Sequence, residues 1–297
     1  MNTNISKHIF FIASYPKSGN TLMRLILSSL FFTSDGIVDI KNIKKINLLE
    51  NIKLLDVIKN INTKDFLNLE NINTLYKYHL TIKEKSNLGF NEDFSFFKTH
   101  HILSSLNGKN YVTQEFVRGI IYLIRDPRDV VVSWANHSNI TLSESVKAIN
   151  NFYGCIGWQK HPRAALPNHI KPSVWVSSWK DHVESWTKNK MNVPTLVIKF
   201  EDLILKKEMT IQTIVNFFKD NYGIEVLNTQ EKIKNILKTT QFDKLKNIEE
   251  SEGFDERIGG VFFNKGQSGQ WREKLTHEQV KNIEEVSKNV MQQYNYK

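Results

Sequence analysis

The sequence predicts one α/β domain over residues 1–297, with a central parallel sheet flanked by helices. Short apolar runs without polar interruption recur along the chain, as in strands that are buried on both faces. Segments with helical spacing separate these runs, and glycine or polar residues follow several of them. Since ligands of parallel sheets bind beyond the carboxyl ends of the strands, these residues are the first candidates for a functional site.

Composition narrows the class of protein. The chain is 40% hydrophobic and 24% charged, which is typical of a globular protein and not of a disordered one. A single cysteine, Cys155, excludes an intrachain disulfide and suits a reducing compartment. No apolar run approaches the ~18 residues of a membrane span, and the N-terminus lacks the pattern of a secretion signal, so we expect a cytoplasmic protein.

The formal net charge of +9 indicates an anionic partner. The lysines are scattered along the chain, and no long basic block appears. A small polyanionic cofactor therefore explains the charge at least as well as a nucleic acid does. A biased base composition of the source genome would also explain part of it.

The stretch from residue 9 to residue 33 predicts a strand, a tight turn and a helix. Ile9–Ala13 is apolar and β-prone, Pro16–Asn20 interrupts it, and helical spacing begins at Thr21. The apolar face of that helix contains Leu22, Leu25, Ile26 and Leu30. A helix that starts after such a turn presents free backbone N–H groups, which form an anion site, and Lys17 adds a positive charge to it.

The order of residues in this turn excludes a Walker A loop, which reads Gly-x-x-x-x-Gly-Lys-Ser/Thr. The turn resembles instead the 5′-phosphosulfate loop of the sulfotransferases that use 3′-phosphoadenosine 5′-phosphosulfate (PAPS), written Tyr-Pro-Lys-Ser-Gly-Thr/Asn-Thr. The resemblance implies that the donor is bound by Lys17, Ser18, Gly19, Asn20 and Thr21. The alternative is a strand, turn and helix with an incidental lysine.

Residues 34–93 show two short amphipathic patterns, over 48–58 and 72–80, and no motif. We expect a helical excursion that lines an acceptor pocket or covers the sheet. The next run, over 94–101, is strand-like and carries Lys98, Thr99 and His100 to its carboxyl end. It resembles the sulfotransferase element Phe-x-Lys-Thr-His, in which the histidine is the general base. The neighbouring His101 is not expected to take that role.

Gly119–Arg125 is the clearest buried strand, and Pro127 suits the first turn of the helix that follows it. Arg125 stands at the strand end, and Ser133 lies about two helical turns inside the helix. This spacing resembles the family's 3′-phosphate motif, Arg-Asn/Asp-Pro-Lys/Arg-Asp-x-x-x-Ser, which implies that Arg125 and Ser133 bind that phosphate. The alternative is a surface helix start at Arg128–Asp129, which explains the second arginine but not the pair.

Between residues 141 and 194 the sequence predicts two helices and a loop. Thr141 and Glu144 form a capping box that opens a helix to about Tyr153. Residues 154–173 lose periodicity, and a long irregular loop of this kind suggests a substrate gate. Helical spacing returns in five residues for which core packing is expected: Trp175, Trp179, His182, Val183 and Trp186. This segment resembles the family helix Trp-x-x-His-Val, to which we assign a structural role.

Thr195–Phe200 predicts a fourth buried strand, and an amphipathic helix follows over 210–221. Phe200 and the Glu-Asp-Leu after it resemble the family's Tyr-Glu-Asp-Leu/Met, in which the tyrosine contacts adenine. Thr240-Gln-Phe242 resembles the Thr-Ser-Phe that binds the same base. The resemblance therefore implies that Phe200, Thr240 and Phe242 hold the adenine.

The loop over 261–271 resembles Arg-Lys-Gly-x-x-Gly-Asp-Trp, the family's second contact to the 3′-phosphate. Lys265 and Gly266 match this motif, while Asn264 replaces its arginine, and the resemblance places all three at the phosphate. Thr276 and Gln279 then form a capping box for a C-terminal helix.

The resemblance runs in order from residue 8 to about residue 275 and implies a sulfotransferase with a P-loop NTPase-like fold. It implies transfer of a sulfuryl group from PAPS to an acceptor, most simply a hydroxyl, with adenosine 3′,5′-bisphosphate (PAP) as product and no metal. Lys17 would stabilise the bridging oxygen and Lys98 the sulfuryl oxygens. His100 would take the proton of the acceptor.

Two features depart from the family pattern: Leu22 replaces a tryptophan that stacks on adenine in the cytosolic enzymes, and Asn264 removes a guanidinium. The acceptor is left open between a small molecule and a glycan, and dimerisation does not follow. A P-loop-like nucleotide kinase would share the fold but should show a Walker A order and Mg²⁺-binding positions. A non-catalytic nucleotide- or nucleic-acid-binding protein would explain the charge but not His100.

Overall fold

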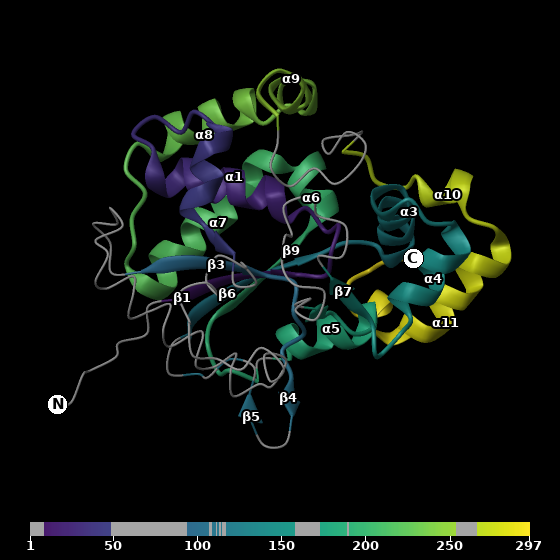
Figure 1. The fold of residues 1–297 in the computed structure, drawn as a ribbon. Helices are drawn as coiled ribbons and strands as arrows, with labels where there is room; N and C mark the ends of the chain where they lie inside the picture. The colour runs from purple at the N-terminus through teal and green to yellow at the C-terminus, as the bar shows by residue number, and fades with distance from the viewer. Residues whose placement is uncertain are drawn as a thin grey trace, which may run out of the picture.

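The computed structural model describes residues 9–48, 94–106, 109–110, 112, 114, 117–157, 173–188, 190–253 and 266–297. Five parallel strands form a central sheet in the order β2-β3-β1-β6-β9, with helices on both faces (Figure 1). The strands are β1 (Ile9–Ser14), β2 (Asn47–Leu48), β3 (Ser95–Thr99), β6 (Val117–Ile124) and β9 (Thr195–Lys199). The predicted α/β class with a central parallel sheet is confirmed.

The apolar runs form strands because both faces of the sheet are covered. All six residues of β1 are buried, and successive side chains enter opposite cores. Phe11 packs in the core that contains α5 (Trp179–Thr187), and Phe10 packs in the core that contains α1 (Asn20–Phe32) and α7 (Lys207–Tyr222). A strand covered on both sides is apolar throughout, which is why these runs show no alternation.

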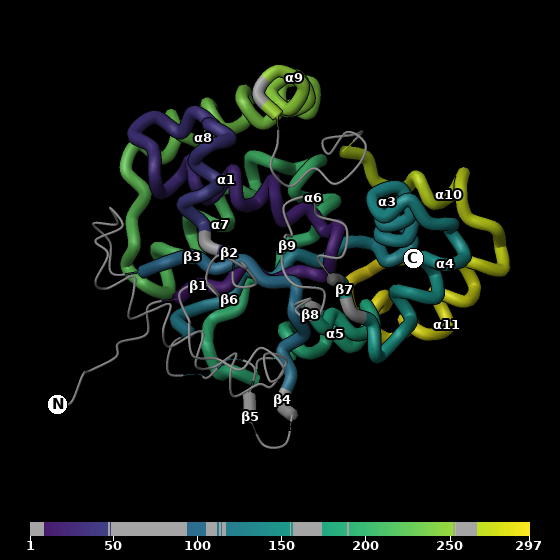
Figure 2. The backbone as a smooth tube through the Cα atoms, viewed as in Figure 1, coloured from purple at the N-terminus to yellow at the C-terminus, as the bar shows by residue number. Residues whose placement is uncertain are grey.

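The remaining helices form two groups. Near α1 and α7 lie η1 (Ile40–Lys45), α6 (Phe200–Leu205), α8 (Thr229–Thr239) and α9 (Phe242–Glu252) (Figure 1). The other group, to one side of the sheet, consists of α3 (Pro127–Ser138), α4 (Leu142–Ile149), α10 (Trp271–Lys274) and α11 (His277–Gln293). The C-terminus of the chain lies among this second group (Figure 2). In the described ranges, no helix is long and apolar enough to cross a membrane.

Local signals place several helix starts correctly. Asp126 caps α3 with Pro127 in its first turn, and both predicted capping boxes, at Thr141 and Thr276, are present. The helix that begins after Thr141 ends at Ile149 and not near Tyr153. The predicted helices over 48–58 and 72–80 lie outside the described residues, except that residue 48 belongs to β2.

Two antiparallel pairs lie outside the main sheet: β4 (Ser105–Leu106) with β5 (Lys109–Asn110), and β7 (Cys155–Gly157) with β8 (Ser173–Trp175). The two ends of the predicted irregular loop are therefore paired, and its residues 158–172 lie outside the described ranges. The placement of Trp175 on the helix is wrong. α5 begins only at Trp179, because the Ser178 side chain accepts from Asp181 N and caps the helix there.

The strand order positions the site. After β1 the chain forms β2 and β3 on one side of that strand, and it then crosses to β6 and β9 on the other side, so the strand order reverses direction at β1. Ligands of open α/β sheets bind at such a switch point, beyond the carboxyl ends of the strands. The residues that follow β1, β3 and β6 meet there.

Candidate active site

The loop after β1 has the backbone of an anion-binding turn. Lys17 and Gly19 both adopt positive φ angles, of 69° and 92°, and α1 begins at Asn20 without a side-chain cap. The first turn of α1 contains no acidic residue. Because a helix leaves its first N–H groups without intrahelical acceptors, these groups are available to an anion.

Gly19 is required by a close contact as well as by its φ angle. A Cβ at this position would lie 2.6 Å from Cδ2 of Phe200, the first residue of α6. The ring of Phe200 is buried and supports the loop from the end of β9. Phe200 was predicted to hold adenine; the structure places its ring against the loop that leads into α1.

Arg125 extends from the end of β6 into the same place. Its Nη1 donates to Lys17 O at 3.0 Å and its Nη2 donates to Gln267 O at 3.1 Å, while Nε has no hydrogen-bond partner among the described residues. Burial lowers the pKa of Arg125 in spite of the nearby charges of Asp129 and Glu201. A buried guanidinium with unused N–H groups has the chemistry of a phosphate site. Ser133, its predicted partner, is partly exposed two turns into α3.

Asp129, which the sequence analysis did not single out, connects α3 to the C-terminal loop, the described residues 266–270 that precede α10. Its carboxylate accepts hydrogen bonds from Gly269 N at 2.5 Å and from Trp271 N at 3.2 Å. This loop is the one that brings Gln267 O to Arg125. Asp129 therefore holds the loop next to the proposed phosphate site.

The alternative interpretation, in which Arg128 and Asp129 form a surface helix start, is wrong, because the two residues are only 2% and 1% exposed. Arg128 forms ion pairs with Asp126 and Glu284, and its Cζ lies 3.8 Å from the centroid of the Trp271 ring. A buried charge is tolerated when it is paired in this way. Asp126 is a local partner, but Glu284 belongs to α11 and Trp271 to α10, and no local pattern at residue 128 reveals these two.

The structure brings together Gly266, predicted to lie at the 3′-phosphate, and Phe242, predicted to hold the adenine. A Cβ at Gly266 would overlap the ring of Phe242, so the glycine allows the loop to lie against the start of α9.

Thr240 is buried, and its hydroxyl donates to Ile236 O and lies 3.1 Å from Lys207 Nζ. Lys207, which the sequence did not single out, therefore fixes this turn. Asn264 and Lys265 lie outside the described residues.

His100 follows β3 and reaches the end of β1. Its Nδ1 lies 2.7 Å from Ser14 O. A carbonyl oxygen can only accept, so Nδ1 carries the proton and Nε2 is the unprotonated nitrogen. Burial, and then the charge of Lys98, hold the pKa of His100 well below its usual value. The ring is therefore a neutral base near pH 7.

Lys17 lies near two histidines. Its charge contributes to the lowered pKa of His100 and to that of His137, which burial and Lys17 together lower to about 4. His137 belongs to the last turn of α3. Lys98 and Lys17 therefore both act on His100 at this end of the sheet.

The family model for the sulfotransferase domain matches residues 7–295. The chain belongs to the sulfotransferase domain family. Among similar curated proteins, an amine sulfotransferase of Oryctolagus cuniculus is 23% identical over 59% of this chain and 55% of its own length. Sulfotransferase 2A6 of Mus musculus is 25% identical over 65% of this chain and 62% of its own length. The match thus spans a little over half of each relative.

Solved structures show the same fold for this chain. Mouse sulfotransferase SULT7A1 in complex with PAP has a TM-score of 0.55 at 17% identity, over 96% of this chain and 84% of the other. Retinol dehydratase in complex with androsterone and PAP has a TM-score of 0.58 at 20% identity, over 96% and 81% of the two chains. The predicted P-loop NTPase-like architecture, a parallel sheet flanked by helices, is confirmed.

The geometry of the site fits an anionic ligand. Ser18 Oγ and Arg125 Nε are both buried without a hydrogen-bond partner in the described residues, and Arg125 is bonded to Lys17, the residue before Ser18. Buried polar groups are rarely left unsatisfied, and phosphate or sulfate oxygens are suitable acceptors for both. In the described ranges, no three metal-ligating side chains gather.

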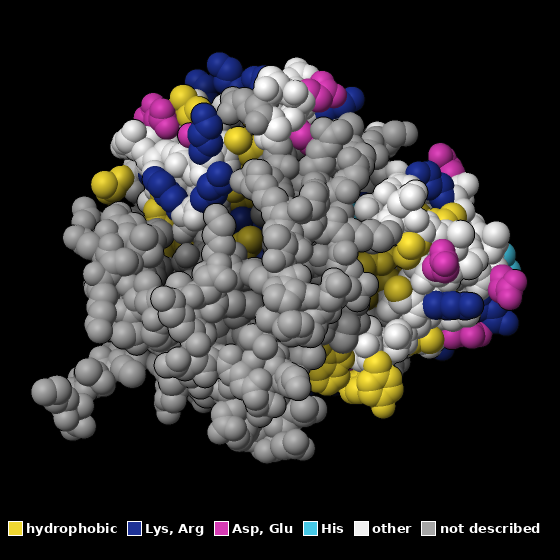
Figure 3. Space-filling view, viewed as in Figure 1, with side chains coloured by type: hydrophobic (Ala, Val, Ile, Leu, Met, Phe, Trp, Pro, Cys, Tyr) yellow, Lys and Arg dark blue, Asp and Glu magenta, His cyan; other side chains and the backbone are white. Residues whose placement is uncertain are grey.

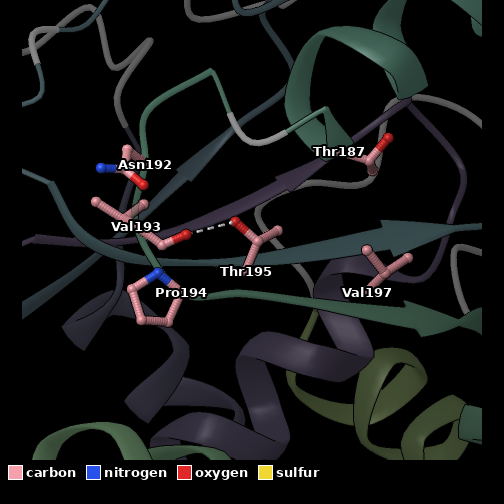
Figure 4. A pocket seen from close by; sticks show the side chains of 6 residues that line it. All are labelled: Thr187, Asn192, Val193, Pro194, Thr195 and Val197. Atoms are coloured by element: carbon pink, nitrogen blue, oxygen red, sulfur yellow. Dashed lines mark hydrogen bonds between the residues drawn. The ribbon is translucent and has the colours of Figure 1, made fainter.

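A cavity elsewhere in the described residues is separate from the site. It measures about 350 Å³ and lies at the start of β9, at the opposite end of the sheet from Phe200. Figure 4 shows its uncharged lining, in which Thr195 Oγ1 donates to Val193 O. Without a positive charge in its lining, this cavity does not suit a polyanion.

Proposed function

We propose that this chain transfers a sulfuryl group from PAPS to a hydroxyl of a small-molecule acceptor and releases PAP. The observation that carries the proposal is the contact between His100 Nδ1 and Ser14 O, at 2.7 Å. It places the proton on Nδ1, so Nε2 is the nitrogen that can act as a base, at the same end of the sheet as the loop proposed to bind the donor. A positioned base is needed for transfer to a hydroxyl and has no use in nucleotide binding alone.

Two groups of residues are assigned to the two anionic ends of the donor. The backbone N–H groups at the start of α1, with Lys17 and Ser18, are assigned to the 5′-phosphosulfate. Arg125 and Ser133 are assigned to the 3′-phosphate, because the buried guanidinium has unused N–H groups. The other assignments follow the family motifs: Gly19, Asn20 and Thr21 at the phosphosulfate, Asn264, Lys265 and Gly266 at the 3′-phosphate, and Phe200, Thr240 and Phe242 near the base.

When bound, the donor supplies an activated sulfuryl group and a phosphate leaving group. Lys17 stabilises the negative charge that grows on the leaving phosphate as the sulfur–oxygen bond breaks, and Lys98 stabilises the sulfuryl oxygens. His100 Nε2 accepts the proton of the acceptor hydroxyl while its oxygen forms the new bond to sulfur, and the proton then passes to water. These groups supply both charge stabilisation and proton transfer, so we propose that no metal is required.

A small molecule is favoured over a glycan as acceptor. The rabbit relative is named for an amine acceptor, and retinol dehydratase was solved with androsterone. Both are small molecules. We also propose a cytoplasmic location, because a chain with a single cysteine suits a reducing compartment.

Neither rival function gains support from the described residues. On the described part of the face shown in Figure 3, Lys and Arg side chains are mixed with Asp and Glu, whereas a nucleic-acid surface would need a continuous basic stripe. A nucleotide kinase would need a Walker A loop, and the order Lys17-Ser18-Gly19 differs from that motif.

The experiment is transfer of labelled sulfate from PAPS to a panel of phenols, alcohols, steroids and amines, with an oligosaccharide as the glycan arm. We expect label on at least one hydroxyl acceptor, and we expect the reaction to survive EDTA. The control is Lys17→Met, which should lower kcat more than it weakens PAP binding, because the charge acts mainly in the transition state. No transfer to any acceptor, together with no binding of PAP, would contradict the proposal.

A further inference from the structure

One helix fixes the backbone that follows β3. Each contact joins an α5 side chain to a backbone group: His182 Nε2 to His100 O (3.1 Å), Trp186 Nε1 to His101 O (2.9 Å) and Ser185 Oγ to Leu103 N (3.1 Å). These groups lie on one side of α5, at positions 182, 185 and 186. The helix to which the sequence assigned only core packing therefore contacts the proposed base directly.

The contact with His100 belongs to a buried polar pair. The His100 carbonyl can only accept, so His182 Nε2 carries the proton and His182 Nδ1 is bare. Tyr122 Oη lies 2.8 Å from that Nδ1 and therefore donates to it. Both side chains have no exposed surface. Tyr122 thus determines which nitrogen of His182 faces His100.

Packing alone does not account for a histidine at position 182. Burial lowers the pKa of His182 to about 3, so the ring stays neutral and both nitrogens need partners. Its ring does pack against Tyr15, with centroids 5.5 Å apart. A leucine would fill much of this space without any polar atom to satisfy. What the histidine adds is the N–H that it donates to His100.

His100 is therefore held at two points. Its ring is bonded to Ser14 O, and its own carbonyl is bonded to His182. The carbonyl fixes the orientation of the peptide from which the side chain leaves, and the ring contact fixes the side chain itself. We propose that His182, oriented by Tyr122, is a positioning residue for sulfuryl transfer and keeps His100 Nε2 directed at the acceptor. The proposal rests on the proposed function, in which His100 is the base.

The test compares three α5 variants. His182→Leu removes the donor and keeps much of the volume, so kcat should fall by about 10- to 100-fold, the effect of a misplaced reacting group, while PAP affinity stays within about twofold. His182→Gln can present an N–H near the position of Nε2 and should recover most of this loss. The matched control is Ser185→Ala, which removes a bond of the same kind to residue 103 and should leave kcat within about twofold.

Tyr122→Phe keeps the test decisive if His182→Leu does not fold. It removes one oxygen atom and frees His182 to change tautomer, so kcat should fall while PAP affinity does not. The ¹⁵N spectrum of the histidine rings gives a second measure, because His100 should be protonated at Nδ1 in the wild type and less uniformly so in Tyr122→Phe.

The outcomes separate this proposal from the proposed function. Unchanged kcat in the folded variants at positions 182 and 122, with His100→Ala inactive, overturns the positioning role. Equal losses of kcat and PAP affinity in every variant, Ser185→Ala included, also overturn it, since they indicate a purely structural helix. The proposed function itself fails if the wild type transfers no sulfuryl group or if His100→Ala keeps its kcat.

Discussion

The guanidinium of Arg125 lies over the ring of Phe200, with Cζ 4.3 Å from the ring centroid, and the same ring lies against Gly19. The ends of β6 and β9 and the loop after β1 therefore meet at one buried cation. The hydrogen-bond partners of Arg125 in the described residues are two carbonyl oxygens, of Lys17 and Gln267. A cation held in this way is stabilised further by an anionic ligand.

We expect Arg125→Met to remove the preference of the protein for PAP over AMP. Loss of two charge-assisted hydrogen bonds to the 3′-phosphate should weaken PAP binding by about 3 kcal/mol, with little change for AMP. The midpoint of thermal unfolding of the free protein should not fall, because a buried guanidinium without a bonded carboxylate is unfavourable for folding. Calorimetry with both nucleotides and a thermal melt measure these effects.

The matched control is Arg118→Met. Arg118 lies on the same strand at its other end, where it contacts the rings of Phe10 and Tyr222. This variant should leave both affinities unchanged. An intact PAP preference in Arg125→Met, or an equal loss in Arg118→Met, would remove Arg125 from the 3′-phosphate site.

Gly19→Ala is expected to destabilise the protein and to abolish PAP binding. The new Cβ would strain a φ angle of +92° and lie 2.6 Å from Phe200. Gly223→Ala is the control, because Gly223 also has a positive φ, of +65°, but open space around it. The strain alone should cost about 1–2 kcal/mol at Gly223 with PAP binding intact, and Gly19→Ala should cost more. Equal costs by urea unfolding would show that the contact with Phe200 is unimportant.

Local patterns predict much of this fold because their causes are local. The run Ile9–Ala13 is apolar because both faces of β1 are covered, and the strand extends only one residue further. The capping box at Thr141 is a bond between residues three positions apart. The loop from Lys17 to Gly19 likewise owes its shape to its own residues.

Contacts between distant segments are what the sequence could not show. Asp129 and Gly269 are bonded across 140 positions, and His182 and His100 across 82. Nothing near Asp129 distinguishes a buried carboxylate from a surface one until the C-terminal loop is placed. Trp175 fits the helical spacing of α5, but a hydrogen bond from Ile102 N to its carbonyl fixes it beside the segment after β3.

His100→Ala should lower kcat by about 10²- to 10⁴-fold, the usual contribution of a positioned base, and leave PAP affinity near the wild-type value. His101→Ala is the control. Its ring is buried, and its Nδ1 lies 2.7 Å from Ile102 O, so the variant should unfold at a lower temperature while kcat changes little. Saturation kinetics and thermal melts separate these effects. If only His101→Ala lost activity, the base would be His101 and the assignment to His100 would be wrong.

Three histidines should make the stability of the protein fall in acid. Burial is the main cause that lowers the pKa of His182 to about 3, that of His137 to about 4 and that of His100 well below its usual value. In the unfolded chain these groups titrate near about 6.5, so below that pH the unfolded state binds more protons than the folded state. This contribution to stability is complete above pH ~6.5 and is lost as pH falls towards the folded values.

His182→Gln should therefore flatten the dependence of the free energy of unfolding on pH. Each proton taken up on unfolding contributes a slope of about 1.4 kcal/mol per pH unit, and this variant removes one of them. Urea unfolding between about pH 5 and pH 6.5 avoids most carboxylate titration. If His182→Gln keeps the wild-type slope, burial does not hold His182 neutral in the folded protein.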